Sequence, residues 1–228
     1  MGTITLLTDF GSKDPYTGIM KGVILTIDPG AVIVDITHEV EPQDIREAAF
    51  LVDDYWKYFP PATVHVVVVD PTVGSGRRPV IVSRKGHHFV GPDNGVFTNI
   101  MGSDTEVHVI ENRNFMLPSV SPTFHGLDIF SPAAARLSRG FYPRAFGRKI
   151  TDPVVLDGIH PVADGNTLTG EIVRFDRFGN ALTNITGSAL KSFVGDGPFE
   201  IGTGSLSFTA VSRSYYEDRF TCLVGSSG

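Results

Sequence analysis

The sequence contains a single cysteine, Cys222, which excludes an internal disulfide framework and is typical of a reducing compartment. It has no apolar run long enough to span a membrane, and its first residues lack the basic and apolar regions of a signal peptide. No cluster of lysine and arginine offsets the formal net charge of −6, so a nucleic-acid-binding surface is not expected. These absences predict a cytoplasmic protein that binds neither nucleic acid nor membrane.

Several common catalytic motifs are also missing. The sequence has no Gly-x-Ser-x-Gly elbow, no P-loop and no Gly-x-Gly-x-x-Gly dinucleotide fingerprint. The residues that could be interpreted as metal ligands are Asp9, Asp70, His125 and Asp128. No pair of them has the spacing of ligands on one helix, and the nearby Arg77 would oppose a cation. We therefore predict no metal site.

Among the features that are present, the segment Thr63–Arg78 (TVHVVVVDPTVGSGRR) is the most informative. Its four consecutive valines predict a central strand that is buried on both faces. The strand is expected to end at Asp70-Pro71, and a Gly-Ser-Gly turn then leads to two arginines. Ligands of open α/β sheets bind beyond the carboxyl ends of the strands, so this segment is the first candidate for chemistry.

The first part of the chain alternates predicted strands with predicted helices. Strands are expected over 3–8, 31–36 and 64–69, and helices over 16–27 and from Asp44 to about Tyr58. Asp14 is expected to cap the first helix, and Asp44 with Glu47 to form a capping box for the second. This alternation predicts a parallel sheet. Polar residues follow all three strands: Asp9, Thr37-His38 and Asp70.

The later part of the chain has a different pattern. We expect an antiparallel strand pair over 79–83 and 88–90, with His87-His88 at the surface, a strand over 106–110, and a helix over 129–139 capped by Asp128. Residues 140–165 are interpreted as a linker, and after Gly170 short alternating runs without a convincing helix follow. The sequence thus predicts an N-terminal α/β domain with a mostly parallel sheet (1–155) and a smaller all-β, barrel-like domain (156–228).

Three charged or titratable residues are candidates for catalysis. Asp70 and Arg77 are seven residues apart across a glycine-rich turn, so the arginine can fold back onto the carboxylate. The alternative is a salt bridge that only stabilises the loop. His125, between Phe124 and Gly126, could position or polarise a water if it lies near this pair; the alternative is a structural histidine.

Other residues are candidates for binding. Asp9 and Asp14 flank a turn, and the alternative for them is a turn carboxylate and a helix cap. Asp176, Phe178 and Asn180 belong to a strand-turn-strand segment that carries an aromatic ring and amide groups. An amide can hydrogen-bond an adenine edge while a ring stacks on the base, so this segment could bind a nucleobase; the alternative is an ordinary β-turn.

Together these residues give a pattern that resembles the S-adenosyl-L-methionine hydroxide adenosyltransferases, the hydrolase branch of the chlorinase/fluorinase superfamily. The matching segments are Thr8–Gly11, Asp35–His38, Val69–Gly74, Arg77-Arg78, Gly91–Gly95, Thr123–Gly126, Phe178–Asn180 and Thr183–Ile185. They occur in the expected order over nearly the whole chain. Each motif is only moderately specific, but their order together is highly specific.

The resemblance implies an enzyme that hydrolyses S-adenosyl-L-methionine to adenosine and L-methionine, with no cofactor. It also implies a homotrimer with active sites between neighbouring subunits. In that family's scheme the catalytic residues would be Asp70, Arg77 and His125, and Asp9 would bind the ribose hydroxyls. Asp14, Asp176, Ser226 and Ser227 would face the methionine moiety, and Phe178 with Asn180 the adenine.

The sequence departs from the family pattern at two places. Leu127 follows His125-Gly126 where the family often has arginine, and the chain ends at residues 225–228 where the family usually continues. Either a further C-terminal segment completes the adenine site or this site is reduced; we expect the former, because a domain that ends in a glycine turn leaves a strand edge uncovered.

Two other functions are alternatives to hydrolysis. A halogenase of the same superfamily would use a halide as the nucleophile, but an ionised Asp70 would repel a halide and can orient a water. The sequence also lacks a long insertion before Val64 of the sort expected of fluorinating enzymes. A protein that binds S-adenosylmethionine or adenosine without turnover is the second alternative.

Overall fold

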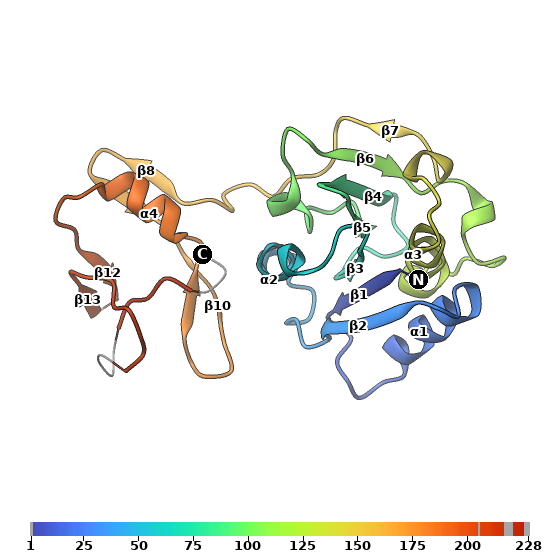
Figure 1. Ribbon diagram of the computed structural model, residues 1–228, viewed down its shortest axis with the longest axis horizontal. Helices are drawn as coiled ribbons and strands as arrows, with labels where there is room; N and C mark the ends of the chain where they lie inside the picture. The colour runs from blue at the N-terminus through green and yellow to red at the C-terminus, as the bar shows by residue number, and fades with distance from the viewer. Residues whose placement is uncertain (1, 205, 217–220, 226–228) are drawn as a thin grey trace. The chain divides into compact units, whose positions relative to one another are not determined.

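The computed structural model describes residues 2–204, 206–216 and 221–225, and the chain divides into two compact units, Met1–Asp157 and Gly158–Gly228. Figure 1 shows the chain coloured from its N-terminus to its C-terminus. The chain has no described helix that is both long and apolar enough to cross a membrane.

The first unit is built on a seven-stranded sheet with three α-helices. Its strands are β1 (Thr3–Thr8), β2 (Val32–Thr37), β3 (Val64–Val68), β4 (Pro79–Arg84), β5 (His87–Pro92), β6 (Glu106–Val109) and β7 (Lys149–Ile150). Its helices are α1 (Tyr16–Ile27), α2 (Ile45–Tyr55) and α3 (Ser131–Ser138). Short 3₁₀ turns occur at Trp56–Tyr58, Thr98–Ile100, Arg113–Phe115 and Pro143–Ala145.

The strand order is β2-β1-β3-β5-β4-β6-β7. The first four of these strands run parallel to one another. The βαβ pattern predicted this for β1, β2 and β3, whereas the parallel pairing of β5 with β3 was not predicted. The remaining strands join by antiparallel pairing, β4 with β5 and β6 and then β6 with β7. The sheet is therefore mixed, and it is parallel only in the half that carries the predicted polar strand ends.

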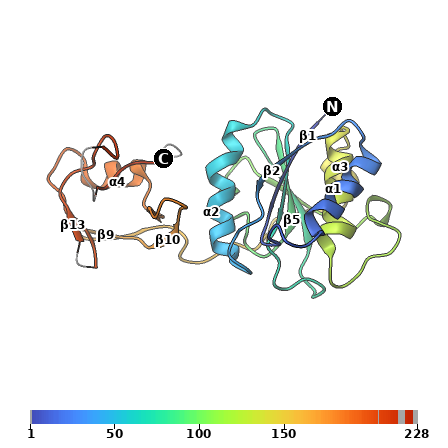
Figure 2. The ribbon, with the colours of Figure 1, turned by 90° about the horizontal axis from the view of Figure 1, so that it is seen from below.

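The two faces of the sheet are covered by different helices, as Figure 2 shows: α1 and α3 lie on one face and α2 on the other. Strand side chains alternate between these two layers because successive residues point to opposite faces. Leu6 packs in the cluster that contains Met20 of α1, whereas Leu7 packs in the cluster that contains Val52 of α2. Burial on both faces explains the continuous valine run of β3.

The ends of α1 and α2 test two expectations about helix caps. The carboxylate of Asp44 accepts a hydrogen bond from the Glu47 N–H, as predicted for α2. The Glu47 side chain, however, accepts from the N–H of Glu41 and not from that of Asp44. The prediction for Asp14 is wrong, because α1 begins after Pro15 and has no side-chain cap.

The segment around Asp128 also differs from the prediction. Residues Gly126–Phe130 form a π-helical turn that continues directly into α3, so Asp128 lies inside a helix and does not cap one. Its buried carboxylate accepts a hydrogen bond of 2.7 Å from the N–H of Ser121. A π-helical turn commonly marks a functional site, and this one immediately follows His125.

The region 140–157 is not a linker in the structure. Strand β7 completes the main sheet against β6, and Asp157 is the last residue of the first unit. The expected surface position of His87 is also wrong, since this residue is 5% exposed.

The second unit consists, in its described residues, of three two-stranded antiparallel sheets and one helix. The sheets pair β8 (Val162–Asp164) with β9 (Thr167–Thr169), β10 (Ile172–Phe175) with β11 (Ala181–Thr183), and β12 (Ile201–Thr203) with β13 (Leu206–Phe208). Helix α4 (Gly187–Val194) was not predicted, although Thr186 supplies an ordinary N-cap by accepting from the Ala189 N–H.

Candidate active site

The polar strand ends of β2, β1 and β3 lie at one edge of the sheet. These strands are neighbours and run parallel, so the residues that follow them emerge on the same side. Asp9 directly follows β1 and His38 directly follows β2, whereas Val69 separates Asp70 from the end of β3. This edge is the place where open α/β sheets bind ligands.

Asp70, Arg77 and His125 are in direct contact. Arg77 donates from Nε to Asp70 Oδ1 at 3.1 Å and from Nη2 to Asp70 Oδ2. The same Nη2 lies 2.7 Å from His125 Nδ1. The side chains of Asp70 and Arg77 are 4% and 7% exposed, and the guanidinium lies over the ring of Phe130 at 5.3 Å from its centroid. The three residues predicted to carry the chemistry therefore form one cluster, in which the side chains of Asp70 and Arg77 are buried and His125 is half-buried.

The contact with Arg77 determines how His125 carries its proton. A guanidinium can only donate, so Nδ1 must be the acceptor and cannot hold a proton. Burial lowers the pKa of His125, and the positive charge of Arg77 lowers this pKa further. His125 is therefore neutral at pH 7, with its proton on Nε2, which makes Nε2 a hydrogen-bond donor.

Two loops must approach closely to form the cluster. Gly74, between Asp70 and Arg77, has φ +80°, and a Cβ at this position would clash with the carbonyl oxygen of Pro122 in the loop before His125. Glycine is needed here both for its backbone conformation and for the absence of a side chain.

We predict that Gly74→Ala destabilises the protein by about 1–3 kcal/mol and lowers kcat at least tenfold, because it forces the Arg77 loop away from His125. Gly76→Ala is the matched control, because a Cβ at position 76 would have no neighbour within 4 Å. Thermal unfolding and steady-state kinetics of both variants test this. Equal activities for the two variants would contradict the prediction.

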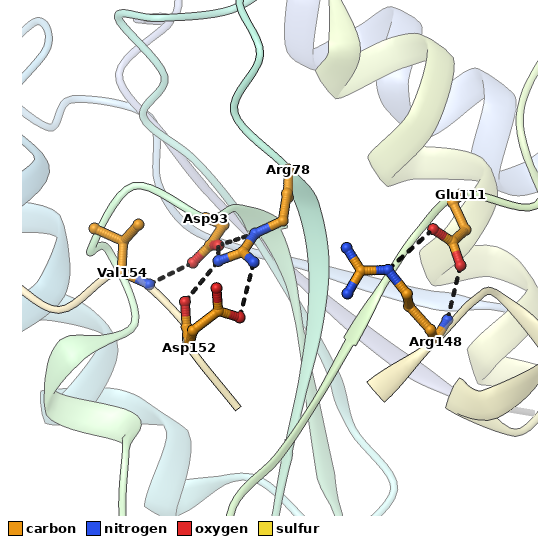
Figure 3. A network of polar contacts seen from close by, with 6 residues as sticks. All are labelled: Arg78, Asp93, Glu111, Arg148, Asp152 and Val154. Carbon is orange, nitrogen blue, oxygen red and sulfur yellow. Dashed lines mark hydrogen bonds and ion pairs between the residues drawn. The ribbon is translucent and has the colours of Figure 1, made fainter. Parts of the chain in front are cut away.

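The turn formed by Asp93 and Asn94 holds the Asp70–Arg77 loop at both ends. Asn94 Nδ2 donates to the carbonyl of Val69 at 2.9 Å, next to Asp70. Arg78, next to Arg77, donates from Nε to Asp93 Oδ2 at 2.7 Å and from Nη1 to Asp152 Oδ1 at 2.9 Å, as Figure 3 shows. Of the two adjacent arginines, Arg77 thus faces His125 and Arg78 is tied to this turn.

Asp9 lies in a surface hollow of about 380 Å³ that is lined by residues 9–11 and 38–42. Its Oδ2 accepts a hydrogen bond of 2.9 Å from the N–H of Gln43, which adopts φ +69°. The loops that line the hollow follow β1 and β2, so Asp9 is placed at the same sheet edge as Asp70. Its neighbours Glu39 and Glu41 give the hollow an acidic character that suits a cation.

Three aromatic rings join the Asp9 loop to the His125 loop. Phe10, Tyr16 and Phe124 contact one another edge to face, with centroids 5.4–5.8 Å apart. Asp14, which precedes Tyr16 by two residues, is exposed. The rings therefore link the residue after Asp9, the start of α1 and the residue before His125.

The adenine-binding candidates belong to the second unit. Asp176 Oδ1 accepts from the backbone N–H groups of Phe178 and Asn180, and Oδ2 accepts from Asn180 Nδ2 at 2.7 Å. These bonds, led by the one from the Asn180 side chain, lower the pKa of Asp176. The ring of Phe178 is 89% exposed. Ser226 and Ser227 lie outside the described residues.

Among the described residues, no three His, Cys, Asp or Glu side chains are grouped in a way that could hold a metal ion. The absence of a metal requirement stays a prediction. Sequence reasoning overlooked the roles of Asn94, His38 and Gln43, although the first two lie in segments that carried the family resemblance. The signal for Asn94 was the Pro-Asp-Asn-Gly turn at the end of a strand.

Comparison with protein families gives matches over both units. Residues 4–147 match the SAM hydroxide adenosyltransferase N-terminal domain, and residues 170–228 match the SAM hydroxide adenosyltransferase C-terminal domain. The chain belongs to the SAM hydroxide adenosyltransferase family. This membership confirms the resemblance that the sequence motifs indicated.

Two relatives in this family are named (R)-S-adenosyl-L-methionine hydrolase. The protein from Thermus thermophilus is 37% identical, covering 85% of this chain and 78% of its own length. The protein from Methanocaldococcus jannaschii is 34% identical, covering 99% of this chain and 85% of its own length. The crystal structure of an uncharacterized conserved protein from Thermotoga maritima superposes with a TM-score of 0.86 at 37% identity, covering 94% of this chain and 84% of that one.

More distant relatives carry the name of the alternative activity. A protein named fluorinase from Actinoplanes sp. is 26% identical, covering 80% of this chain and 71% of its own length. The relatives named hydrolase are therefore more similar in sequence to this chain than the relative named fluorinase.

Proposed function

We propose that this protein hydrolyses S-adenosyl-L-methionine at the ribose C5′ to give adenosine and L-methionine. The proposal rests above all on the buried contact of Arg77 with both Asp70 and His125. Its relatives are named for the (R) form, so we propose the (R)-sulfonium epimer as the preferred substrate. The substrate is a cation, which suits an acidic hollow and nearby aromatic rings.

The reaction is a displacement at a saturated carbon. A water oxygen forms a bond to C5′ while the C5′–S bond breaks and its electron pair stays on sulfur. Methionine then leaves as a neutral thioether and needs no acid. One proton must leave the attacking oxygen, so the protein has to orient a water in line with the C5′–S bond and accept its proton.

The contacts of the cluster favour Asp70 as the proton acceptor. Nδ1 of His125 is already occupied by Arg77, and Nε2 carries the proton of the neutral ring. The ring is also hydrogen-bonded to the backbone of Ser121, so His125 is held in place and has no vacant basic nitrogen. Each carboxylate oxygen of Asp70 accepts one hydrogen bond from Arg77 and keeps a lone pair for the water. Arg77 holds both partners at the required spacing.

The remaining substrate contacts follow the family scheme. We propose that Asp9 binds the ribose hydroxyls and that Asp14, Asp176, Ser226 and Ser227 face the methionine moiety. Phe178 and Asn180 would contact adenine. The Asp176 carboxylate already holds the Phe178–Asn180 turn, so it can also act by shaping the adenine contact.

The experiment is incubation of the protein with each sulfonium epimer, with and without chloride or fluoride, followed by separation of the products. Adenosine and methionine are expected in equal amounts and faster from the (R) form, whatever the halide concentration. Formation of 5′-halo-adenosine would instead establish a halogenase. Binding without any product would establish a binding protein.

The protonation state of His125 predicts the pH dependence of turnover. Its pKa in the folded protein is below the ordinary 6.5, so the ring stays neutral as the pH falls through 6.5 and becomes charged only at lower pH. Charging puts a proton on Nδ1 and breaks the contact with Arg77. We therefore expect kcat/KM to be constant from pH 8 down to about 6.5 and to decrease only at lower pH. A decline that begins above pH 7 would contradict this assignment.

We further propose that the enzyme is a cytoplasmic homotrimer with active sites between subunits and that it needs no cofactor. Exposed apolar side chains on neighbouring elements, Ile19 and Leu25 of α1 and Val32 of β2, offer a surface for such contacts. Light scattering should then give a mass three times 24.7 kDa. A monomeric mass together with full activity would exclude shared sites.

A further inference from the structure

The two loops that line the hollow are joined through His38. Nδ1 of His38 lies 2.9 Å from the hydroxyl oxygen of Thr8, which is fully buried at the end of β1. The same hydroxyl accepts a hydrogen bond of 3.3 Å from the N–H of Phe10. The carbonyl of His38 accepts a further bond of 2.7 Å from the N–H of Gly11. One residue of the β2 loop thus contacts both ends of the segment that contains Asp9.

A shift in strand pairing places His38 opposite Thr8. Leu6 of β1 pairs with Asp35 of β2, but the next residue, Leu7, pairs with Thr37. The strands therefore slip by one residue just before they end. With this slip Thr8 and His38 come level, whereas regular pairing would have put Thr37 beside Thr8.

The imidazole of His38 is also held from its other side. Its Nε2 lies 3.1 Å from Asp35 Oδ1, and Lys21 Nζ lies 2.5 Å from Asp35 Oδ2. The alignment at Nε2 is not that of a hydrogen bond, so the attraction to Asp35 is electrostatic. Burial would raise the pKa of Asp35, but the hydrogen bond from Lys21 and the proximity of His38 together outweigh burial and lower it. The carboxylate is thus ionised and restrains the ring.

We infer that His38 is a positioning residue for the recognition of a ribose diol by Asp9, an inference that rests on the proposed function. A carboxylate accepts two neighbouring hydroxyls well only when it is placed within a few tenths of an ångström. Asp9 lies between Thr8, whose hydroxyl contacts His38, and Phe10, whose N–H donates to the same hydroxyl. The Oδ2 of Asp9 is oriented by the N–H of Gln43, at the far end of the β2 loop. Loss of the His38 link frees both loops and misplaces this carboxylate.

The test is calorimetric binding of adenosine and 2′,3′-dideoxyadenosine, which requires no turnover. The wild-type protein should bind adenosine at least tenfold more tightly. His38→Ala should weaken adenosine binding about tenfold and leave dideoxyadenosine binding within twofold. His38→Asn, whose amide can still reach the Thr8 hydroxyl, should keep most of the preference. Thr8→Val should behave like His38→Ala.

Thr5→Val is the matched control. Thr5 is a buried threonine of the same strand, and its hydroxyl lies 2.9 Å from His65 Nδ1, so the variant removes an equivalent Thr–His bond away from Asp9. It should retain the adenosine preference. A full preference in His38→Ala, equal weakening of both nucleosides, or no preference in the wild type would each overturn the inference. If the variants change the preference for adenosine over dideoxyadenosine as expected, but the wild type releases no adenosine from S-adenosyl-L-methionine, the proposed hydrolysis is refuted and the inference about His38 stands.

Discussion

Asp70→Asn is expected to lower kcat by about three orders of magnitude, while the Kd for adenosine changes less than about threefold. The amide keeps the size of the side chain but cannot accept the proton of the water. It also removes the charge that holds Arg77, which is 7% exposed and would lie in the interior without a counter-charge. Stability should therefore also fall, by about 3–5 kcal/mol. Single-turnover kinetics and calorimetry well below the melting temperature separate these effects.

Asp93→Asn is the matched control for Asp70→Asn. The Asp93 side chain is 4% exposed, as that of Asp70 is, and it also pairs with an arginine, but Arg78 is 25% exposed and has a second carboxylate partner in Asp152. This variant should therefore lose less stability than Asp70→Asn and no more than about tenfold in kcat, because Asp93 acts on the loop from the side of Arg78. Equal losses of kcat in the two variants would show that the Asp70 pair is structural, which was the alternative drawn from the sequence.

Most of the first unit could be predicted from the sequence because local patterns and packing agree there. The apolar runs and turn residues predicted β1, α1 and β3 closely, and the polar residues that follow three strands lie, as expected, at one edge of the sheet. The antiparallel half of the sheet was harder to predict from the sequence. A two-residue strand such as β7 has no pattern of its own, and it forms because β6 offers a free edge.

The sequence predicted which residues form the candidate catalytic cluster, but not which of their atoms are in contact. The spacing of Asp70 and Arg77 indicated a contact across the turn, whereas the approach of His125 depends on Gly74 lying against Pro122, two loops that are far apart in the sequence. Which atom of His125 faces Arg77 is a tertiary property. The atom that faces Arg77 determines which nitrogen of His125 accepts a hydrogen bond and which one donates, and no sequence motif encodes this choice.

The wrong predictions for Asp128 and His87 have a common cause: each residue type is favourable both in the predicted position and in the position that it occupies in the structure. Asp128 is a good cap residue, yet its carboxylate is used inside the fold by the Ser121 N–H. His87 follows a Lys-Gly turn, which indicated the surface, but its ring stacks against that of His65 with centroids 5.4 Å apart. The Thr8–His38 contact depends on a slip in strand pairing, which side-chain alternation does not reveal.

The buried histidine pair leads to the second large expected effect, a loss of stability in mild acid. His65 is fully buried, with Nδ1 2.9 Å from the Thr5 hydroxyl and Nε2 3.2 Å from His87 Nδ1. The Thr5 hydroxyl also lies 3.2 Å from that of Tyr55. Burial lowers the pKa of His65 to about 3, with contributions from the charges of His87 and His88. The ring is thus neutral in the folded protein over most of the acid range.

The sign of the pH dependence follows from this depressed pKa. Below an unfolded pKa of about 6.5 the unfolded chain binds a proton that the folded chain does not, so the folded state loses stability as the pH falls towards 3. At about 1.4 kcal/mol per pH unit the total is at most about 5 kcal/mol, and above pH 6.5 the contribution is constant. The single tryptophan, Trp56, packs against His87, so its fluorescence during denaturant unfolding reports on this region.

His65→Phe should flatten the decline between pH 6.5 and 4, because phenylalanine has no proton to gain and fits a site where His65 already stacks on Phe89, with centroids 4.8 Å apart. The variant loses the bonds to Thr5 and His87, so its free energy of unfolding at pH 7.5 should be lower than that of the wild type. Near pH 4 the two curves should converge or cross. His160→Phe, at an exposed position, should leave the slope unchanged. Parallel curves for the wild type and His65→Phe would show that His65 takes up no proton on unfolding. Acid sensitivity would then have to come from the carboxylates or from the other histidines whose pKa is lowered, His87, His88, His108 and His125.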